Sequence, residues 1–401
     1  MPEPRLPLPD VPASEIPTTG VQVRSLKELL DLISGRNVVD TQPQGDAGLA
    51  ERLPFPFLAL VGQQEMRLAL LLALINPAIG GVLLVGPRGT GKTTAVRSLL
   101  DLLPPSEIST CFYGCLPEDI ESGGMEAVCP ECARKYGEGR PLTIQDRVRL
   151  VELPLNARLE DVIGGLDERV VTHERMRLKR GILAHADRNL LYIDEVNLVG
   201  NEIIDAILDA AAQGIYTVRR GLVAATYRAR FILVGSMNPE EGSLRAQILD
   251  RFGLRIVVRG LVQSEQRLEA YRRVRAYQTN PYGTIAQFAD ATEMARLEIT
   301  AARKLLPSVQ ISEKVAAAGI NMVQKLGIDS LRAEYSMFEA ARALAAADTR
   351  DHVILEDLRM VAPMALRMRR SRFMQDYFDA RKVEEAELHG LLSLNDPENP
   401  S

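Results

Sequence analysis

The chain lacks the positive charge that marks many nucleic-acid-binding proteins. Its 401 residues include 53 Asp and Glu against 48 Lys and Arg, for a formal net charge of −5. Because duplex-coating proteins draw most of their affinity from cationic contacts to phosphate, this balance disfavours that class. The sequence also has no stripe of basic and aromatic residues of the kind that binds single strands. We therefore expect no nucleic-acid partner.

The chain also lacks an uninterrupted apolar run of membrane length. The stretch 68–86 is almost entirely apolar, but Asn76-Pro77 and Gly80-Gly81 divide it into a short helix and a short strand. The first ten residues, MPEPRLPLPD, have neither the basic segment nor the apolar run of a secretory signal. We expect a cytoplasmic protein with no membrane span.

Histidine and cysteine are scarce, with four of each. The histidines are scattered and make no metal-binding set, whereas the cysteines all fall within one short segment. Their spacing is Cys111-x3-Cys115-x13-Cys129-x2-Cys132. This spacing predicts tetrahedral binding of Zn²⁺ by thiolates. The alternatives are a redox-responsive dithiol at the last two cysteines and free thiols without a role.

Composition and periodicity divide the chain into four regions. Residues 1–52 are a Pro-rich, partly disordered extension with one short helix expected at 25–33. Residues 53–262 alternate strands and helices, which predicts an α/β domain whose parallel sheet lies between helices. Residues 263–390 carry apolar residues at helical spacing without strands, which predicts an all-α domain. Residues 391–401 form a tail.

Particular segments carry these expectations. Strands are expected at 81–85, 189–193 and 231–235, with helices between them at 93–103 and 203–213. In the all-α domain, helices are expected at 263–280, 285–306, 312–326, 331–347 and 354–388. Asp329-Ser330 is expected to cap the helix that starts at 331.

Residues 86–93 match the phosphate-loop pattern G-x-x-x-x-G-K-[ST], after a strand and at the start of a helix. Its glycines let successive backbone N–H groups curve around a phosphate, and the helix start adds positive potential. Lys92 supplies a charge to the β- and γ-phosphates, and the Thr93 hydroxyl a ligand for Mg²⁺. The residues expected to bind nucleotide here are Gly86, Pro87, Arg88, Gly89, Thr90, Gly91, Lys92, Thr93 and Thr94.

Polar residues also follow the next two strands. The run LLYIDE carries Asp194 and Glu195 to the carboxyl edge of the sheet, beside the phosphate loop. We expect Asp194 to complete the Mg²⁺ shell and Glu195 to activate the attacking water. Asn238, at the end of the third strand, is expected to contact that water or the γ-phosphate. Its alternative role is that of a turn-forming Asn before Pro239.

Arg251 follows a predicted helix that leads away from its own phosphate loop. An arginine that stabilises charge on the γ-phosphate can come from the same chain or from a neighbouring one. We expect Arg251 to act in the site of an adjacent subunit, which requires a ring, with Asp250 orienting it or contacting the neighbour. A surface Arg–Asp pair is the alternative.

Together these features resemble an AAA+ ATPase, a resemblance that implies that the all-α domain at 263–390 is an all-α lid domain. More closely, the stretches 55–99, 190–199, 231–254 and 326–348 resemble the ATPase (I) subunits of the magnesium chelatase family. The run Met-Asn-Pro-Glu-Glu-Gly, soon followed by Leu-Asp-Arg-Phe-Gly-Leu, is much more specific than the phosphate loop alone. The resemblance extends over about residues 55–370.

This resemblance implies a motor subunit with ATP and Mg²⁺ as cofactors. Such a subunit hydrolyses ATP in a homo-oligomeric ring, expected to be a hexamer. It drives Mg²⁺ insertion into protoporphyrin IX, for chlorophyll or bacteriochlorophyll, together with an integrin-domain D subunit and a porphyrin-binding H subunit. The resemblance also implies that Val61, Gly62 and Gln63 border the adenine, and that Arg332 is a lid arginine that senses the γ-phosphate.

The chain departs from the family pattern in two inserted segments, a hairpin insertion near 214–230 and the segment 153–157, which keeps the family's Leu-Pro-Leu but shifts the acidic pair after it. Its Cys-rich insertion at 104–140 is similar to that of some bacterial members of the family. The family's hairpin usually reads like VEREG and later HPARF, where this chain has VRRGL at 218–222 and YRARF at 227–231. The altered hairpin leaves a second function open, a MoxR-like AAA+ chaperone that remodels a metal-cofactor or integrin-type partner. A ring helicase is disfavoured by the acidic charge balance.

Overall fold

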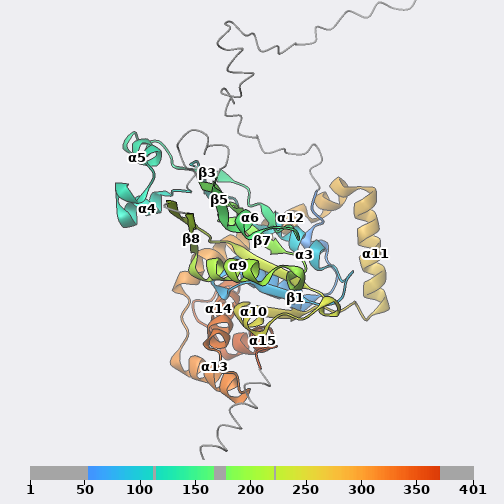
Figure 1. Cartoon of the computed structure of the whole chain (residues 1–401). Helices are drawn as coiled ribbons and strands as arrows, with labels where there is room; N and C mark the ends of the chain where they lie inside the picture. Colours follow the sequence, from blue (N-terminus) through green and yellow to red (C-terminus); the bar gives the residue numbers. More distant parts are fainter. Residues whose placement is uncertain (1–52, 112–113, 167–177, 221–222, 371–401) are drawn as a thin grey trace, which may run out of the picture. The chain divides into compact units, whose positions relative to one another are not determined.

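The structure is a computed structural model that describes residues 53–370, apart from 112–113, 167–177 and 221–222. Its centre is a parallel five-stranded sheet in the order β11-β1-β10-β7-β4 (Figure 1). The strands are β1 (Val82–Val85), β4 (Leu150–Glu152), β7 (Leu190–Ile193), β10 (Ile232–Met237) and β11 (Leu254–Val257). The parallel sheet and three of its strands agree with the prediction, whereas β4 and β11 are additional.

Helices cover both faces of this sheet. Strands β1, β7 and β10 are buried along their whole length, which explains their continuous apolar sequences. Successive side chains point to opposite faces, so Val82 and Leu84 enter one hydrophobic core and Leu83 and Val85 the other. The first core includes α2 (Gln64–Ile75) and α3 (Lys92–Ser98), and the second α6 (Leu159–Ile163), α8 (Ile182–Ala186) and α9 (Asn201–Gln213).

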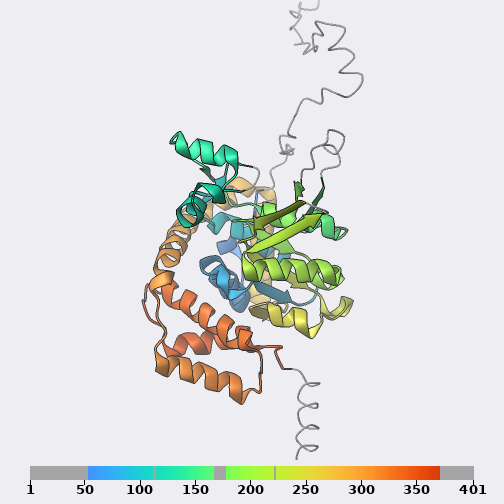
Figure 2. The same ribbon diagram turned by 60° about the vertical axis from the view of Figure 1, so that its left-hand side comes forward.

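The C-terminal helices are α11 (Ser264–Thr279), α12 (Pro281–Leu305), α13 (Glu313–Lys325), α14 (Leu331–Ala347) and α15 (Leu355–Leu366). Those from α12 to α15 contribute to the first of these cores, whereas α11 buries none of its residues. Ile299 of α12, Met337 of α14 and Leu358 of α15 belong to the same hydrophobic cluster as Val82 of the sheet. Figure 2 shows α13–α15, in orange, gathered below the sheet.

The helix expected at 354–388 is wrong in length, because α15 ends at Leu366. Met368 has a left-handed backbone with φ 58°. Arg367 donates to the Arg255 carbonyl at 3.3 Å, and Arg369 donates to Asp250 at 2.7 Å. These contacts turn the chain back onto the α/β domain and stop the helix. Residues 371–388 lie outside the described part, as does the short helix expected at 25–33.

Two segments are added to the sheet. The first begins and ends in an antiparallel pair, β2 (Ser106–Ser109) with β3 (Thr143–Asp146), and carries α4 (Pro117–Gly123) and α5 (Pro130–Gly137), which project from the body in Figure 1. The second is the hairpin β8 (Ile215–Arg220) and β9 (Val223–Arg228).

A further short pair joins β5 (Gly164–Leu166) to β6 (Leu178–Arg180), and α10 spans Ala246–Arg251. The 3₁₀ turns are η1 (Phe57–Ala59), η2 (Pro77–Ile79), η3 (Leu99–Leu102), η4 (Met125–Ala127), η5 (Val196–Leu198), η6 (Pro239–Glu241) and η7 (Leu306–Ser308). Within the described residues, none of the helices combines the length and apolarity needed to cross a membrane.

Candidate functional site: a nucleotide pocket

The phosphate loop connects the end of β1 to the start of α3. Gly89 and Gly91 adopt φ values of 76° and 84°, which residues with a side chain rarely reach, and this lets the loop curl back on itself. Lys92, at the first position of α3, donates from Nζ to the carbonyls of Gly86 (2.7 Å) and Pro87 (2.8 Å). Burial lowers the pKa of Lys92, and the nearby carboxylates of Asp194 and Glu195 act against this shift.

The sheet order brings the predicted residues together. Strand β10 lies between β1 and β7, with Val85 opposite Met237 and Ile193 opposite Gly235. The carboxyl ends of the three strands therefore meet at one edge, as parallel pairing requires. A cavity of about 320 Å³ opens there. Its walls are Arg88, Gly89, Thr90, Gly91, Lys92, Thr93, Thr94, Asp194, Glu195, Ser236, Met237 and Asn238.

Asp194 is fixed by two hydroxyl donors that the sequence analysis missed. Its Oδ1 accepts hydrogen bonds from the Tyr192 hydroxyl at 2.8 Å and from the Ser236 hydroxyl. Its Oδ2 lies 3.5 Å from the Thr93 hydroxyl, which is itself 3.1 Å from the Tyr192 hydroxyl. Thr93 and Asp194 thus present oxygen atoms side by side, as a Mg²⁺ site requires. Ser236 could have been noticed as a polar residue inside an apolar strand.

Glu195 is held by an ion pair across the mouth of the cavity. Its backbone is left-handed, with φ 53°, and its N–H donates to the Ser236 hydroxyl at 3.2 Å. The exposed guanidinium of Arg88 lies 3.2 Å from the Glu195 carboxylate and 2.5 Å from that of Glu241. The sequence analysis placed Arg88 in the phosphate loop, but it did not predict this bridge or Glu241.

Asn238 lies in the cavity wall and also caps a turn. It is 3% exposed, and its Nδ2 donates to Glu241 Oε1 at 3.1 Å. Its Oδ1 accepts from the Glu240 N–H at 3.3 Å, at the start of η6. The turn-forming role is therefore present, in a position from which the amide borders the phosphate cavity.

A second cavity of about 380 Å³ lies on the other side of the phosphate loop. Val61, Gln63, Leu261 and Val274 give it apolar and amide walls, and it shares Gly89, Thr90, Gly91 and Thr94 with the phosphate cavity. Gln63 donates to the Arg259 carbonyl at 2.6 Å. Gly62 has φ 65°, and an added Cβ would lie 2.6 Å from Leu261. The shape and position suit a planar base attached to phosphates in the loop.

Arg251 and Asp250 lie away from both cavities and face different partners. Arg251 pairs with Asp209 of α9 at 2.8 Å and lies 3.5 Å from the Asp205 carboxylate. Asp250 accepts from Ser330 at 2.8 Å and from Arg369 at 2.7 Å. Among the described residues Asp250 therefore joins the C-terminal helices to α10, and the expectation that it orients Arg251 is wrong within one chain.

Arg332 also lies outside the phosphate cavity of its own chain. Its guanidinium is 57% exposed and lies 3.5 Å from Asp250. Ser330 precedes α14 as expected, but its hydroxyl donates to Asp250, and no side-chain bond caps the helix. Arg251, expected to act in the site of an adjacent subunit, and Arg332, expected to sense the γ-phosphate from the lid, thus both remain predictions.

The four cysteines form a cluster in the first added segment. The sulfur atoms of Cys111, Cys115, Cys129 and Cys132 all lie within 4.8 Å of one another. The thiols are free of disulfide bonds, and those of Cys111, Cys115 and Cys132 are buried. This is the second place in the described part of the chain where side chains could hold a metal ion.

Two family models match the chain. The AAA domain matches residues 80–241, and the AAA lid domain matches residues 319–389. The α/β domain followed by a helical lid therefore agrees with the fold that the sequence predicted.

Curated relatives align over most of the chain. A magnesium-chelatase subunit ChlI homolog from Methanocaldococcus jannaschii is 42% identical over 335 residues, which is 82% of this chain and 90% of the relative. The magnesium-chelatase 38 kDa subunit of Acidiphilium rubrum is 42% identical over 79% of this chain and 91% of its own. The magnesium-chelatase subunit ChlI of Synechocystis sp. is 39% identical over 79% of this chain and 88% of its own.

Solved structures are also similar. A structure of the complex between subunits BchI and BchD of magnesium chelatase, based on cryo-EM, is 37% identical, covers 81% of this chain and 99% of its own, and has a TM-score of 0.46. A putative ATPase from Cytophaga hutchinsonii is 21% identical, covers 82% and 90% respectively, and has a TM-score of 0.51. The second likeness concerns the fold alone.

Proposed function

The chain belongs to the magnesium-chelatase ChlI subunit family, and from this membership we propose that it is the ATP-hydrolysing motor of such a chelatase. The substrate of the site is ATP with its Mg²⁺. Hydrolysis around a homo-oligomeric ring would drive a D subunit and an H subunit to insert Mg²⁺ into protoporphyrin IX. The observation that carries the proposal is the convergence of Lys92, Thr93, Asp194 and Glu195 on one cavity, in a chain about 40% identical to chelatase subunits.

The geometry supports a division of labour within the site. The adenine would enter the cavity beside Val61 and Gln63, and the phosphates would lie along the loop, where Lys92 can exchange the Gly86 and Pro87 carbonyls for phosphate oxygens. Thr93 and Asp194 would hold the Mg²⁺ that accompanies ATP and that withdraws charge from the phosphates. Glu195 and Asn238 would orient the attacking water, and Glu195 would accept its proton.

The phosphate cavity of a single chain lacks Arg251, the arginine expected to come from a neighbour, and this supports a ring. Arg251 pairs with aspartates of α9 on the surface, and no described cation other than Lys92 and Arg88 lines the phosphate cavity of the same chain. Helix α11 also exposes apolar side chains, with Leu268 and Tyr271 each about half accessible. Charged and apolar surfaces of this kind are what a neighbouring subunit covers.

The MoxR-like chaperone is not favoured. That alternative depended on the altered hairpin, whereas the relatives that match over about four-fifths of the chain carry magnesium-chelatase names. Glu118 and Asp119 of the first added segment pair with arginines of the hairpin region, which gives those basic residues a structural reason.

Reconstitution tests the proposal directly. The chain is mixed with the D and H subunits of a magnesium chelatase, Mg-ATP and protoporphyrin IX, and the fluorescence of the metallated porphyrin is followed. We expect insertion with the natural chain and none with Lys92→Ala, whereas Lys304→Ala, a change on α12 far from the loop in sequence, should retain it. ATP hydrolysis by the chain without any porphyrin metallation would contradict the chelatase assignment.

A further inference from the structure

The cysteine cluster lies where two short parts of the first added segment meet. Cys111 and Cys115 precede α4, whereas Cys129 is the N-cap of α5 and Cys132 lies in its first turn. Pro130 at the first position of α5 fixes the turn that brings the last two thiols to the same side. All four sulfur atoms lie within 4.8 Å of one another, although 13 residues separate the two pairs.

The sulfur atoms act as hydrogen-bond acceptors. The Cys115 N–H donates to Cys111 Sγ at 3.2 Å, and the Cys129 N–H donates to Cys115 Sγ at 3.3 Å. The Ser109 hydroxyl donates to Cys111 Sγ at 3.4 Å. Donors aimed at sulfur stabilise the thiolate form, which is the form that binds metals. Lys135, one turn after Cys132 on α5, is paired with Glu131 at 2.8 Å.

The segment has little other means of holding its shape. Its hydrophobic cluster contains Cys111, Cys115 and Cys132 but only two other buried residues, Val128 and Leu142. Helix α4 buries none of its residues. Segments of about 40 residues with so small a core usually need a disulfide or a metal to stay folded.

We infer that Cys111, Cys115, Cys129 and Cys132 bind one Zn²⁺ as four thiolates. Tetrahedral Zn–S bonds of about 2.3 Å place sulfur atoms about 3.8 Å apart, inside the spread that the four thiols already have. Binding releases the four thiol protons to solvent, and neither sulfur nor zinc changes oxidation state. Since four protein ligands close the coordination shell, the site is structural and has no position for a substrate.

The site has a clear structural purpose, because α4 connects it to the hairpin. Asp119 of α4 forms an ion pair with Arg228 of β9, and Glu118 pairs with Arg188 at 3.3 Å and with Arg230 at 4.0 Å. Arg228 stands where the family's usual HPARF pattern has proline. The cysteine insertion and the basic hairpin are therefore two halves of one contact, and the zinc would fix the half that carries the carboxylates.

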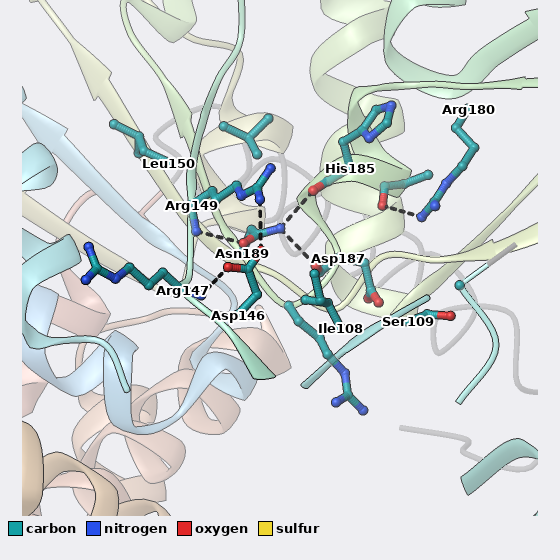
Figure 3. A pocket seen from close by; sticks show the side chains of 14 residues that line it. Ile108, Ser109, Asp146, Arg147, Arg149, Leu150, Arg180, His185, Asp187 and Asn189 are labelled. Carbon is teal, nitrogen blue, oxygen red and sulfur yellow. Dashed lines mark hydrogen bonds and ion pairs between the residues drawn. The ribbon is translucent and has the colours of Figure 1, made fainter. Parts of the chain in front are cut away.

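A polar seam joins the same segment to the sheet edge. The cavity of about 420 Å³ in Figure 3 is bordered by Ile108 and Ser109 of β2 and by Asn189, the residue before β7. Asn189 accepts from the Arg149 N–H at 2.8 Å and donates to the His185 and Asp187 carbonyls. Arg188, the preceding residue, donates to the Glu107 carbonyl of β2 at 2.9 Å and so holds the base of the segment. The zinc would therefore be needed for its outer part, around α4 and α5.

Metal analysis of the full chain, purified without chelator, tests the inference. We expect about one zinc per chain, and less than about one tenth of that in Cys129→Ser/Cys132→Ser. Lys92→Ala is the matched control, because it abolishes nucleotide hydrolysis and should keep its zinc. A natural chain without stoichiometric zinc, one that contains iron instead, or one whose intact mass shows the hydrogens lost in disulfide formation would overturn the inference.

Hydrogen exchange distinguishes the effect of losing the zinc from the effect of losing the ion pairs between α4 and the hairpin. In Arg228→Ala we expect the zinc content to stay near one while the amides of 215–228 exchange faster. In the double serine variant both the 111–137 segment and the hairpin should exchange faster, and the backbone amides of β1 should keep their protection. If removal of the zinc left exchange in 111–137 unchanged, the structural role would be wrong. Neither result depends on whether the chain acts in a chelatase.

Discussion

At the scale of single residues, the site depends on side chains that touch no nucleotide. Tyr192 and Ser236 both donate to Asp194 Oδ1, and Tyr192 also lies within hydrogen-bond distance of Thr93. Burial raises the pKa of Tyr192, so the phenol stays protonated and remains a donor across the physiological range. The proposed Mg²⁺ ligands are therefore oriented before any nucleotide arrives.

The first prediction concerns Tyr192→Phe, which removes one donor from Asp194. We expect the Mg²⁺ concentration that half-saturates ATP hydrolysis to rise by about tenfold, since partners of metal ligands typically contribute 10–100-fold to affinity. A Mg²⁺ titration at fixed ATP measures it. Tyr335→Phe, on the exposed surface of α14, serves as the control and should leave the titration unchanged. Equal midpoints in the two variants would mean that Asp194 does not need Tyr192.

Glu195→Gln is the second prediction. The amide keeps the size of the side chain but cannot accept a proton from water, so we expect nucleotide binding to persist while hydrolysis falls by about 10²–10⁴. Binding of a fluorescent ATP analogue and release of phosphate measure the two quantities. Glu202→Gln, an exposed change at the start of α9, should leave both intact. Near-normal turnover in Glu195→Gln would exclude this residue as the base.

The sequence predicted which residues meet at the pocket but not how they are held. Thr93, Asp194 and Asn238 each follow a strong local pattern, and parallel pairing brings the strand ends together. By contrast, the Arg88 bridge to Glu195 and Glu241 joins residues that are far apart in the chain and have no mutual spacing rule. The Asp250 side chain accepts a hydrogen bond from Ser330, just before α14, instead of contacting Arg251. No local sequence pattern encodes that contact.

At the scale of elements, charged side chains, two of them fully buried arginines, connect α10 to the C-terminal part of the chain. Asp250 accepts from Ser330 and Arg369, and the fully buried Arg255 lies 3.9 Å away. Burial alone would raise the pKa of Asp250, but the Ser330 hydrogen bond and the charge of Arg369 outweigh it and lower the pKa. Burial lowers the pKa of Arg255 to about 9.

A third prediction follows from the sign of the Asp250 shift. A carboxyl whose folded pKa lies below its unfolded value of about 3.9 adds stability above that pH and loses it as the pH falls through the folded pKa. We expect Asp250→Asn to lower the free energy of unfolding by about 2 kcal/mol at pH 7, with the difference shrinking below about pH 4. Denaturant titrations at several pH values measure it.

The control for this prediction is Asp348→Asn. Asp348 forms a surface pair with Arg350 and is 59% exposed, so its loss should change the free energy of unfolding only slightly. A difference between natural chain and Asp250→Asn that stays constant down to pH 3 would show that the carboxylate charge does not contribute to this connection.

Elements were predictable where an apolar run was long and uninterrupted. Strands β1, β7 and β10 meet that condition, but β4 has only three residues and β11 contains Arg255 in the middle of its run. That arginine is buried because the Arg367 and Phe252 carbonyls accept its hydrogen bonds, an arrangement that depends on the distant C-terminal turn. The spacing in α11 likewise predicted a helix, but not that Leu268 and Tyr271 would face solvent.

At the scale of the whole molecule, one chain contains a nucleotide pocket but keeps Arg251 outside it. If Arg251 completes the site of a neighbour, the active unit is an interface rather than a chain. Homomeric Arg251→Ala should then bind ATP through its own Lys92 and Thr93 but fail to hydrolyse it, because every interface lacks the arginine.

The fourth prediction is partial rescue on mixing Arg251→Ala with Lys92→Ala. Some interfaces of a mixed ring pair an intact phosphate loop with an intact Arg251, so ATP hydrolysis should exceed the sum of the separate variants and depend on the mixing ratio. Co-purification through two different tags establishes that mixed rings form. If mixed rings form and hydrolysis stays additive at every ratio, Arg251 acts within its own chain or only in structure.

The bridge from Arg88 to Glu195 and Glu241 also determines the form in which nucleotide enters. Among the described residues at the phosphate cavity and its rim, three carboxylates face two cations, and the exposed cation is already committed to two of the carboxylates. A bare polyphosphate would therefore arrive with its charge opposed by the pocket. A polyphosphate that carries a bound divalent cation would bring the missing positive charge with it. On entry, the pocket would therefore favour the metal complex of the nucleotide over the free nucleotide.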